Sequence, residues 1–266
     1  MRVSPGMSFR ACLLVTAVAF ALLLSACGSS KSQQTPTRTG AIVPTMPAGS
    51  VFVRTYYVRS GKIAVSGRNL VHTLAVGQAS IVLLLGGPTN AESKNGLSTA
   101  LPENTELKKI TTKDGRMTVR LSRNLGRVAR AQVATTLTQF PSVRDVVIVT
   151  PSGSTRPLDR AGFEALMPAV LIESPIPFAQ VRSPLHVSGS SNTFEATSQL
   201  ELLDANGKLL ASKTVTASSG TGTRGTFSVN LRFKAPAGTA TFVSYEESAK
   251  DGSHIDVVRI PLRISR

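Results

Sequence analysis

The chain has 266 residues, enough for one large or two ordinary domains, and its 41% hydrophobic content excludes a wholly disordered protein. With two Cys and three His, it is not a disulfide-rich scaffold, a Cys-rich zinc module or an iron–sulfur protein. Lys and Arg number 30 against 15 Asp and Glu, giving a net charge of +15. Such a balance favours anionic partners.

The N-terminus has the pattern of a signal peptide. After Arg2 and Arg10, residues 11–24 form an apolar run of 14 residues, shorter than the roughly 20 that a membrane-spanning helix needs. The run ends in Leu24-Ser25-Ala26-Cys27, which resembles a bacterial lipobox. The resemblance implies that residues 1–26 are removed and that Cys27 carries lipid. The alternatives are a secretory signal with a coincidental Cys and an uncleaved anchor.

A tether is expected at residues 27–50. Gly28 to Ser50 is rich in Gly, Ser, Thr, Pro and Gln and has no apolar periodicity, so it buries too little surface to offset its ordering entropy. We expect a flexible segment that separates the folded part from the bilayer.

The pattern of residues 51–160, the first folded region, predicts secondary-structure elements in the order ββ-α-ββ-α-β. The apolar stretch Val76–Leu85 fits a strand or a helix, and the following Gly86-Gly87-Pro88 favours a helix. Asp114-Gly115 predicts a hairpin, and Val146–Val149 predicts a strand covered on both faces. The other expected elements are strands at Val51–Val58, Lys62–Ser66, Glu106–Ile110 and Met117–Leu121 and a helix at Arg127–Phe140. This order gives a small α+β sandwich with helices on a sheet.

Three pieces of this region follow one another along the chain: Leu85–Pro88 (LGGP), Gly96–Pro102 (GLSTALP) and Gln132–Pro141 (QVATTLTQFP). In this order they resemble the GerMN domain of sporulation and germination lipoproteins. The chain departs from the GerMN pattern at Arg120, where an acidic or neutral residue is expected. This difference affects a polar contact shared within the family, and not the fold.

A connector at residues 161–169 leads to an all-β region at residues 170–266. Asn206-Gly207 predicts a two-residue hairpin, and Pro261 places the last strand at a sheet edge. About seven strands predict an immunoglobulin-like sandwich. Pieces such as Ser183-Pro184-Leu185 and Phe194-Glu195-Ala196 resemble the Gmad2 domain, an immunoglobulin-like module often found after GerMN domains.

No catalytic or metal-binding motif is apparent. His72, His186 and His254 lie far apart in sequence and are expected to be surface or strand-packing residues, so no metal or cofactor is expected. Ser188–Ser191 is expected to be a loop, and Phe194 a packed residue beside a surface Glu195.

Positive charge is concentrated in the first region. Lys and Arg outnumber Asp and Glu by 16 to 6 between residues 51 and 160, against 10 to 9 between residues 161 and 266. Five arginines are the candidate contact with an anionic surface: Arg116, Arg120, Arg123, Arg127 and Arg130. Anionic lipids or acidic wall polymers are expected rather than nucleic acid. The alternative is a solvated basic face without a partner.

These features predict a non-enzymatic envelope lipoprotein, anchored at the extracytoplasmic side of the cell membrane. By resemblance, its role is in germination, sporulation or the cell wall, and its partners are the membrane, envelope proteins or wall polymers. One alternative is a wall-associated enzyme, such as a hydrolase, whose site is not visible in the sequence. Another is an assembly subunit that self-associates through its α+β domain.

Overall fold

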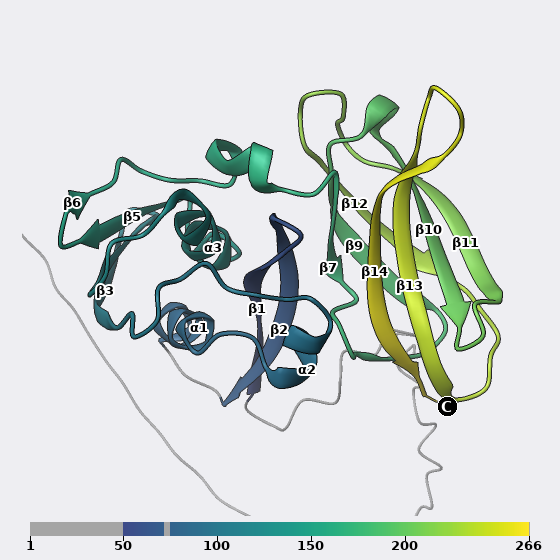
Figure 1. The fold of residues 1–266 in the computed structure, drawn as a ribbon, viewed down its shortest axis with the longest axis horizontal. Coiled ribbons are helices and arrows are strands. Elements are labelled where there is room, and N and C mark those ends of the chain that lie inside the picture. Colours follow the sequence, from purple (N-terminus) through teal and green to yellow (C-terminus); the bar gives the residue numbers. More distant parts are fainter. Residues whose placement is uncertain (1–49, 72–74, 266) are drawn as a thin grey trace, which may run out of the picture. The chain divides into compact units, whose positions relative to one another are not determined.

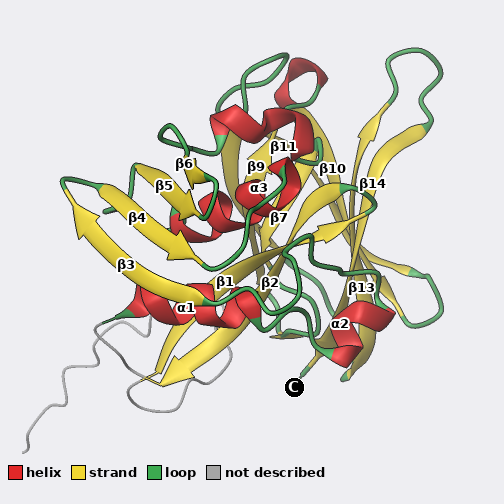
Figure 2. Cartoon of the chain, turned by 60° about the vertical axis from the view of Figure 1, so that its left-hand side comes forward, coloured by secondary structure: helices red, strands yellow, loops and turns green. Residues whose placement is uncertain are grey.

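The computed structural model describes residues 50–71 and 75–265. The predicted signal peptide, Cys27, most of the tether and His72 lie outside these ranges. We call residues 50–154 the α+β region and residues 170–265 the β-sandwich region (Figure 1). Figure 2 shows that α1, α2 and α3 all belong to the first and that strands dominate the second.

The α+β region follows the predicted order of elements with two additions. Its elements are β1 (Ser50–Arg59), β2 (Lys62–Val71), α1 (Val76–Leu85), α2 (Asn90–Lys94), β3 (Leu107–Lys113), β4 (Arg116–Leu121), α3 (Arg127–Leu137), β5 (Asp145–Thr150) and β6 (Gly153–Ser154). The helix expected at Val76–Leu85 is confirmed with the same bounds. The Asp114-Gly115 hairpin is confirmed too, since both residues have positive φ, as a two-residue hairpin turn requires.

Helices α1 and α3 lie between two layers of strands (Figure 1). One layer is the four-stranded sheet β3-β4-β5-β6, and the other is the separate hairpin β1-β2, so the expectation of a single sheet is wrong. The core between them contains Tyr57 of β1, Leu84 of α1, Val133 of α3 and Val119 of β4, all buried. Both helices therefore contribute buried side chains to one core between the two layers of strands.

Three details of this region differ from the sequence-based expectations. Helix α2 was missed although its signal is present: Thr89 and Glu92 form a capping box. Helix α3 ends at Leu137 rather than Phe140, and the Gln139 amide that follows hydrogen-bonds the backbone of β1. Strand β5 is fully buried only on the face that carries Val146 and Ile148. No second layer of the described α+β region covers its opposite face.

The β-sandwich region contains eight strands in two sheets. They are β7 (Val170–Ser174), β8 (Gln180–Val181), β9 (Leu185–Ser191), β10 (Thr197–Asp204), β11 (Leu209–Thr216), β12 (Gly225–Leu231), β13 (Gly238–Glu247) and β14 (His254–Ile264). The five-stranded sheet has the order β11-β10-β13-β14-β8, and the three-stranded sheet has the order β12-β9-β7. Alternating apolar residues of both sheets, including Val187, Leu200 and Phe242, fill the space between them. The predicted fold class, α+β followed by an immunoglobulin-like sandwich, is confirmed.

Three expectations in the β-sandwich region are corrected. Ser188–Ser191 belongs to strand β9 and is not a loop, because it pairs on both sides with β7 and β12. The β10–β11 turn is longer than two residues: Gly207 alone has positive φ, and the Asp204 carboxylate accepts bonds from the amides of Asn206 and Lys208. Strand β14 is not a full edge, since β8 pairs with its last residues.

The connector contains a short helix. The 3₁₀ helix η1 spans Ala161–Leu166, and the Asp159 carboxylate accepts a 2.9 Å hydrogen bond from the Gly162 amide at its start. The domain bounds inferred from the sequence stay predictions. Among the helices of the described residues, none is both long and apolar enough to cross a bilayer.

Candidate functional site

The α+β and β-sandwich regions share a small apolar core at their junction. Tyr56 of β1 and Ala134 of α3 pack there with Phe163 and Met167 of the connector and Leu171 of β7. Buried side chains therefore hold the two regions together, in addition to the covalent connector.

A partly buried polar network crosses this junction. The Tyr56 hydroxyl donates a 2.7 Å hydrogen bond to Glu173 Oε1, and Arg160 Nη1 donates a second 2.7 Å bond to the same oxygen. Arg160 also donates to the Tyr56 hydroxyl at 2.9 Å and to the carbonyl of Thr135 at 3.2 Å. Its guanidinium carbon lies 5.0 Å from the centre of the Tyr56 ring. One arginine thus connects α3, β1 and β7.

The network fixes the charge of Glu173. Burial alone would raise the pKa of its carboxyl group, but the charge of Arg160 and the bonds from Tyr56 and Arg160 lower that pKa below its usual value. Burial raises the pKa of Tyr56 well above its usual value, so its hydroxyl stays a donor. Glu173 is therefore a compensated anion at neutral pH.

A second ion pair fastens the connector to the sandwich. Arg224 contacts both carboxylate oxygens of Glu164 at 2.9 Å and donates to the carbonyl of Pro168 at 2.6 Å. Asn192 adds a 3.0 Å bond to Glu164. Bidentate arginine–carboxylate pairs of this kind fix orientation as well as distance.

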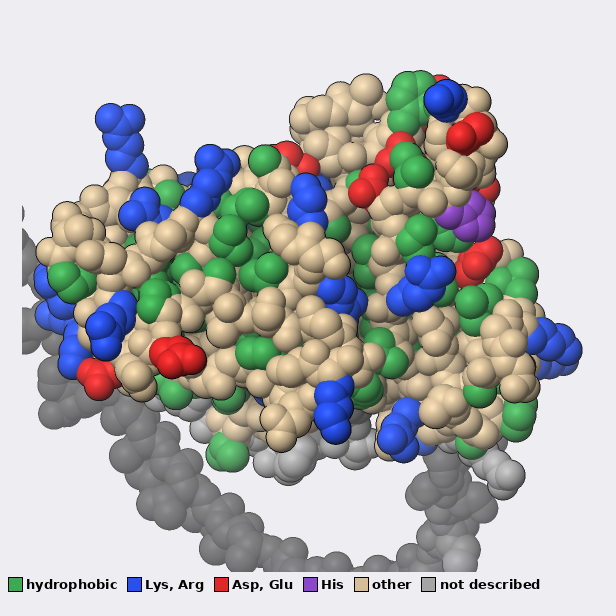
Figure 3. All heavy atoms as spheres, in the orientation of Figure 1, with side chains coloured by type: hydrophobic (Ala, Val, Ile, Leu, Met, Phe, Trp, Pro, Cys, Tyr) green, Lys and Arg blue, Asp and Glu red, His purple; other side chains and the backbone are tan. Residues whose placement is uncertain are grey.

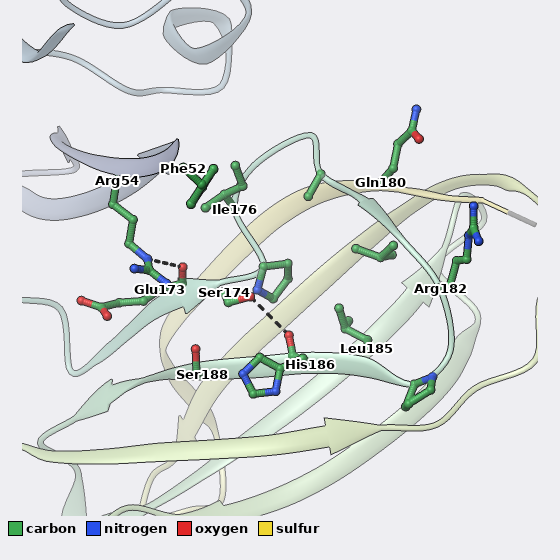
Figure 4. A pocket seen from close by; sticks show the side chains of 14 residues that line it. Phe52, Arg54, Glu173, Ser174, Ile176, Gln180, Arg182, Leu185, His186 and Ser188 are labelled. Atoms are coloured by element: carbon green, nitrogen blue, oxygen red, sulfur yellow. Dashed lines mark hydrogen bonds between the residues drawn. The ribbon is translucent and has the colours of Figure 1, made fainter. Parts of the chain in front are cut away.

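A pocket of about 240 Å³ opens beside the network, which we call the junction pocket (Figure 4). Strand β1 contributes Phe52 and Arg54, and the segment from β7 to β9 contributes the other side. Its apolar wall consists of Phe52, Pro175, Ile176, Ala179, Val181, Pro184 and Leu185.

The charged groups of the junction pocket are mostly cationic. Arg54 and Arg182 lie at opposite ends of it, with Ile176 and Leu185 between them (Figure 4). Among the described residues that line it, Glu173 supplies the only carboxylate, and this group already pairs with Arg160. The arrangement suits an anionic ligand with an apolar part.

Two further hollows lie among the described residues. A groove of about 650 Å³ lies beside β2 and β14, where Arg59 Nη1 donates a 3.0 Å hydrogen bond to the backbone carbonyl of Arg259. A hollow of about 360 Å³ is lined by Arg127, Arg130 and Phe163.

The structure divides the five candidate arginines among different surfaces. Arg116 and Arg120 lie on the face of β4 opposite to the buried Val119, whereas Arg127 and Arg130 lie on α3 at the other side of the sheet. Arg116 is ion-paired with Asp145, and Arg123 lies exposed between β4 and α3. On the face shown in Figure 3, basic side chains are dispersed among polar and apolar ones. Their contact with an anionic surface stays a prediction.

The described histidines lie far apart in the fold. His186 lines the junction pocket, and His254 stacks on Tyr245 with ring centres 3.7 Å apart. Within the described ranges, no three His, Cys, Asp or Glu side chains come together as a metal site requires.

The expectation that Phe194 is a packed residue is wrong, because Phe194 is 53% exposed. The next two residues, Glu195 and Ala196, both have positive φ, and this tight turn directs the preceding ring outward.

Comparison with family models identifies both regions. A model described as "Sporulation and spore germination", Germane, matches residues 54–150. A second, described as "Immunoglobulin-like domain of bacterial spore germination", Gmad2, matches residues 169–253. This chain carries a Germane domain followed by a Gmad2 domain. The resemblances to the GerMN and Gmad2 domains noted in the sequence are thereby confirmed.

Two solved structures are similar to part of this chain. The tandem GerMN domains of the sporulation protein GerM from Bacillus subtilis are 22% identical, with a TM-score of 0.35, over 42% of this chain and 46% of that chain. This chain therefore matches less than half of that tandem structure. The first GerMN domain of the same protein is 22% identical, with a TM-score of 0.30, over 40% of this chain and 86% of that chain. Comparison with curated proteins found no match.

Both domains are thus of sporulation- and germination-related types, and neither family is described as an enzyme. The junction pocket lies where the Germane and Gmad2 domains meet. Sequence reasoning missed Arg54, Tyr56 and Glu173 as a group. The first and last of these are 119 residues apart, and no local pattern links positions at such a separation.

Proposed function

We propose that this chain is a non-enzymatic, lipid-anchored protein that acts as a binding or assembly module at the outer face of the cytoplasmic membrane. The observation that carries the proposal is the lipobox-like Leu24–Cys27 placed before two germination-related domains. A lipid on Cys27 would hold the chain at the bilayer, since two acyl chains anchor a protein stably.

The junction supports a binding role for the two domains together. The Arg160–Glu173 pair and the shared apolar core hold β1 and β7 in a fixed relative position. Residues of both strands line the junction pocket. A site built on strands and supported by a hydrogen-bonded network is preorganised for a ligand.

Crosslinking in intact cells, followed by identification of the captured proteins, tests this proposal. We expect wild-type chain to capture envelope components, and the Cys27→Ser chain to lose them because it leaves the membrane. The same captured set from both chains would contradict the role of the anchor. Hydrolysis of purified wall material by the chain would instead favour the enzyme alternative.

A further inference from the structure

The junction pocket has the chemistry of a receptor for a peptide C-terminus. We propose that it binds the last residue of a peptide, with the free carboxylate on Arg54 and an apolar side chain against Phe52 and Ile176. This inference rests on the proposed function as a binding module and names the class of its ligand.

Arg54 is held in place and still has donors to offer. Its Nε donates a 2.9 Å hydrogen bond to the backbone carbonyl of Glu173, which orients the guanidinium. Among the described residues, neither of its terminal nitrogens has a hydrogen-bond partner. Two parallel N–H donors of one guanidinium match the two oxygens of a carboxylate.

The neighbouring acid does not block an incoming carboxylate. Glu173 directs one oxygen to both Tyr56 and Arg160, so its charge is already compensated within the junction. In Figure 4 its carboxylate points away from Ile176 and Leu185. Arg182 adds a second positive charge at the far end, so an anion meets net attraction in the junction pocket.

The size of the junction pocket favours a chain end over a polymer. Its volume of about 240 Å³ falls below the roughly 300–1,000 Å³ of pockets for drug-sized ligands. The apolar wall therefore has room for one or two small residues. Ser188 and His186 line the floor with polar atoms that a peptide backbone can engage.

The chain's own tether is a poor occupant because its charge has the wrong sign. Residues 28–49 contain Lys31 and Arg38 and no acidic residue. A separate peptide with a free carboxylate is the better match to the junction pocket.

Calorimetry with the full chain in detergent tests the assignment. The probes are acetyl-Gly-Ala-Leu with a free carboxylate, the same peptide with a C-terminal amide, and hexanoate. We expect the acid to bind at least tenfold more tightly than the amide, because only the acid offers an anion to Arg54. Equal affinities for acid and amide, or hexanoate binding as tight as that of the peptide acid, would overturn the proposal.

Variants locate the effect. Arg54→Gln should remove the preference for the acid, whereas Arg156→Gln, the same charge change at an exposed residue outside the junction pocket, should keep it. If Arg54→Gln does not fold, Arg54→Lys retains the charge without the two-pronged geometry, and the preference should fall to a few-fold. An unchanged preference in either folded Arg54 variant would contradict the assignment.

A spectroscopic measurement places the ligand. The methyl resonance of Ile176 in the junction pocket should shift on adding the acid, while that of Ile81, buried in the Germane core, should not. The reverse pattern would place the ligand elsewhere. A chain that does not fractionate with membranes yet prefers the acid would contradict the anchored function alone. A membrane-bound chain without the preference would contradict the pocket assignment alone.

Discussion

The hydroxyl of Tyr56 lies 2.7 Å from the carboxylate of Glu173, 117 residues further along the chain, and donates a hydrogen bond to it. Tyr56 is completely buried, and Arg160, which directly precedes the connector, completes the contact. A strand of the Germane domain is thereby fixed to the first strand of the Gmad2 domain.

Replacing Tyr56 by Phe should lower the free energy of unfolding by about 2 kcal/mol, because a hydrogen bond to a charged group is lost. Urea denaturation measures this. Hydrogen exchange in β7 should also accelerate, since the junction loosens. The matched control is Tyr245→Phe, which removes a similar 3.0 Å bond to Glu201 inside the sandwich. If both variants left exchange in β7 unchanged, the Tyr56 bond would not fix the junction.

Glu92 should make stability depend on pH in the acid range. This carboxyl group is 4% exposed. Burial alone would raise its pKa, but hydrogen bonds from Arg68, Ser66 and Thr89 lower it from 4.5 to about 2. Because the folded-state pKa lies below the unfolded value, the stabilisation is complete above pH 4.5 and is lost as the pH falls towards 2. The shift corresponds to about 3 kcal/mol at neutral pH.

Urea denaturation at several pH values checks this. The stability difference between wild type and Glu92→Gln should shrink as the pH falls from 5 towards 2. The exposed Glu103→Gln is the control and should show a small difference at every pH. A constant gap between wild type and Glu92→Gln would show that Glu92 is not held ionised by the fold.

Gly189→Ala should destabilise the sandwich by about 3 kcal/mol, because the added methyl group overpacks a closed interface. A Cβ atom on Gly189 would lie 2.2 Å from the carbonyl oxygen of Leu171 on the paired strand, and backbone cannot yield as a side chain can. Gly238→Ala is the control, because a Cβ atom added to Gly238 would meet nothing within 4 Å. Similar urea midpoints for the two variants would contradict the close approach of β7 and β9.

Cys27→Ser should leave the chain unprocessed or release it from the membrane fraction, because the thiol that accepts the lipid is gone. Cell fractionation and immunoblotting measure both outcomes. Cys12→Ser is the matched control, since Cys12 lies within the predicted signal and should be replaceable. Identical processing and fractionation of Cys27→Ser and wild type would refute lipidation at Cys27.

Replacing Arg120, Arg123, Arg127 and Arg130 together by Gln should lower retention on anionic vesicles several-fold. Each basic residue near an anionic surface contributes about 1 kcal/mol at most. The control removes four exposed charges from the Gmad2 domain instead: Lys208, Lys213, Arg232 and Lys234. Vesicle sedimentation at low salt measures retention. If both variants lost retention equally, net charge alone would explain the binding. If neither variant lost retention, these arginines would be a solvated face without a partner.

Local chemistry made much of the fold predictable. The Asp114-Gly115 turn and the helix at Val76–Leu85 depend on neighbouring residues, so the turn and helix-ending residues beside them sufficed. The order of the two domains followed from short motifs for the same reason.

The sequence by itself determined the lipobox-like Cys27, the α+β region followed by a sandwich, and the excess of positive charge in the first region. Only the tertiary structure decided that Arg54 lies beside Glu173, that the candidate arginines occupy different surfaces and that Phe194 is exposed. The physical reason is the range of the forces involved. Turn and helix preferences act over a few residues, whereas packing and ion pairs join positions more than 100 residues apart, which no local pattern encodes.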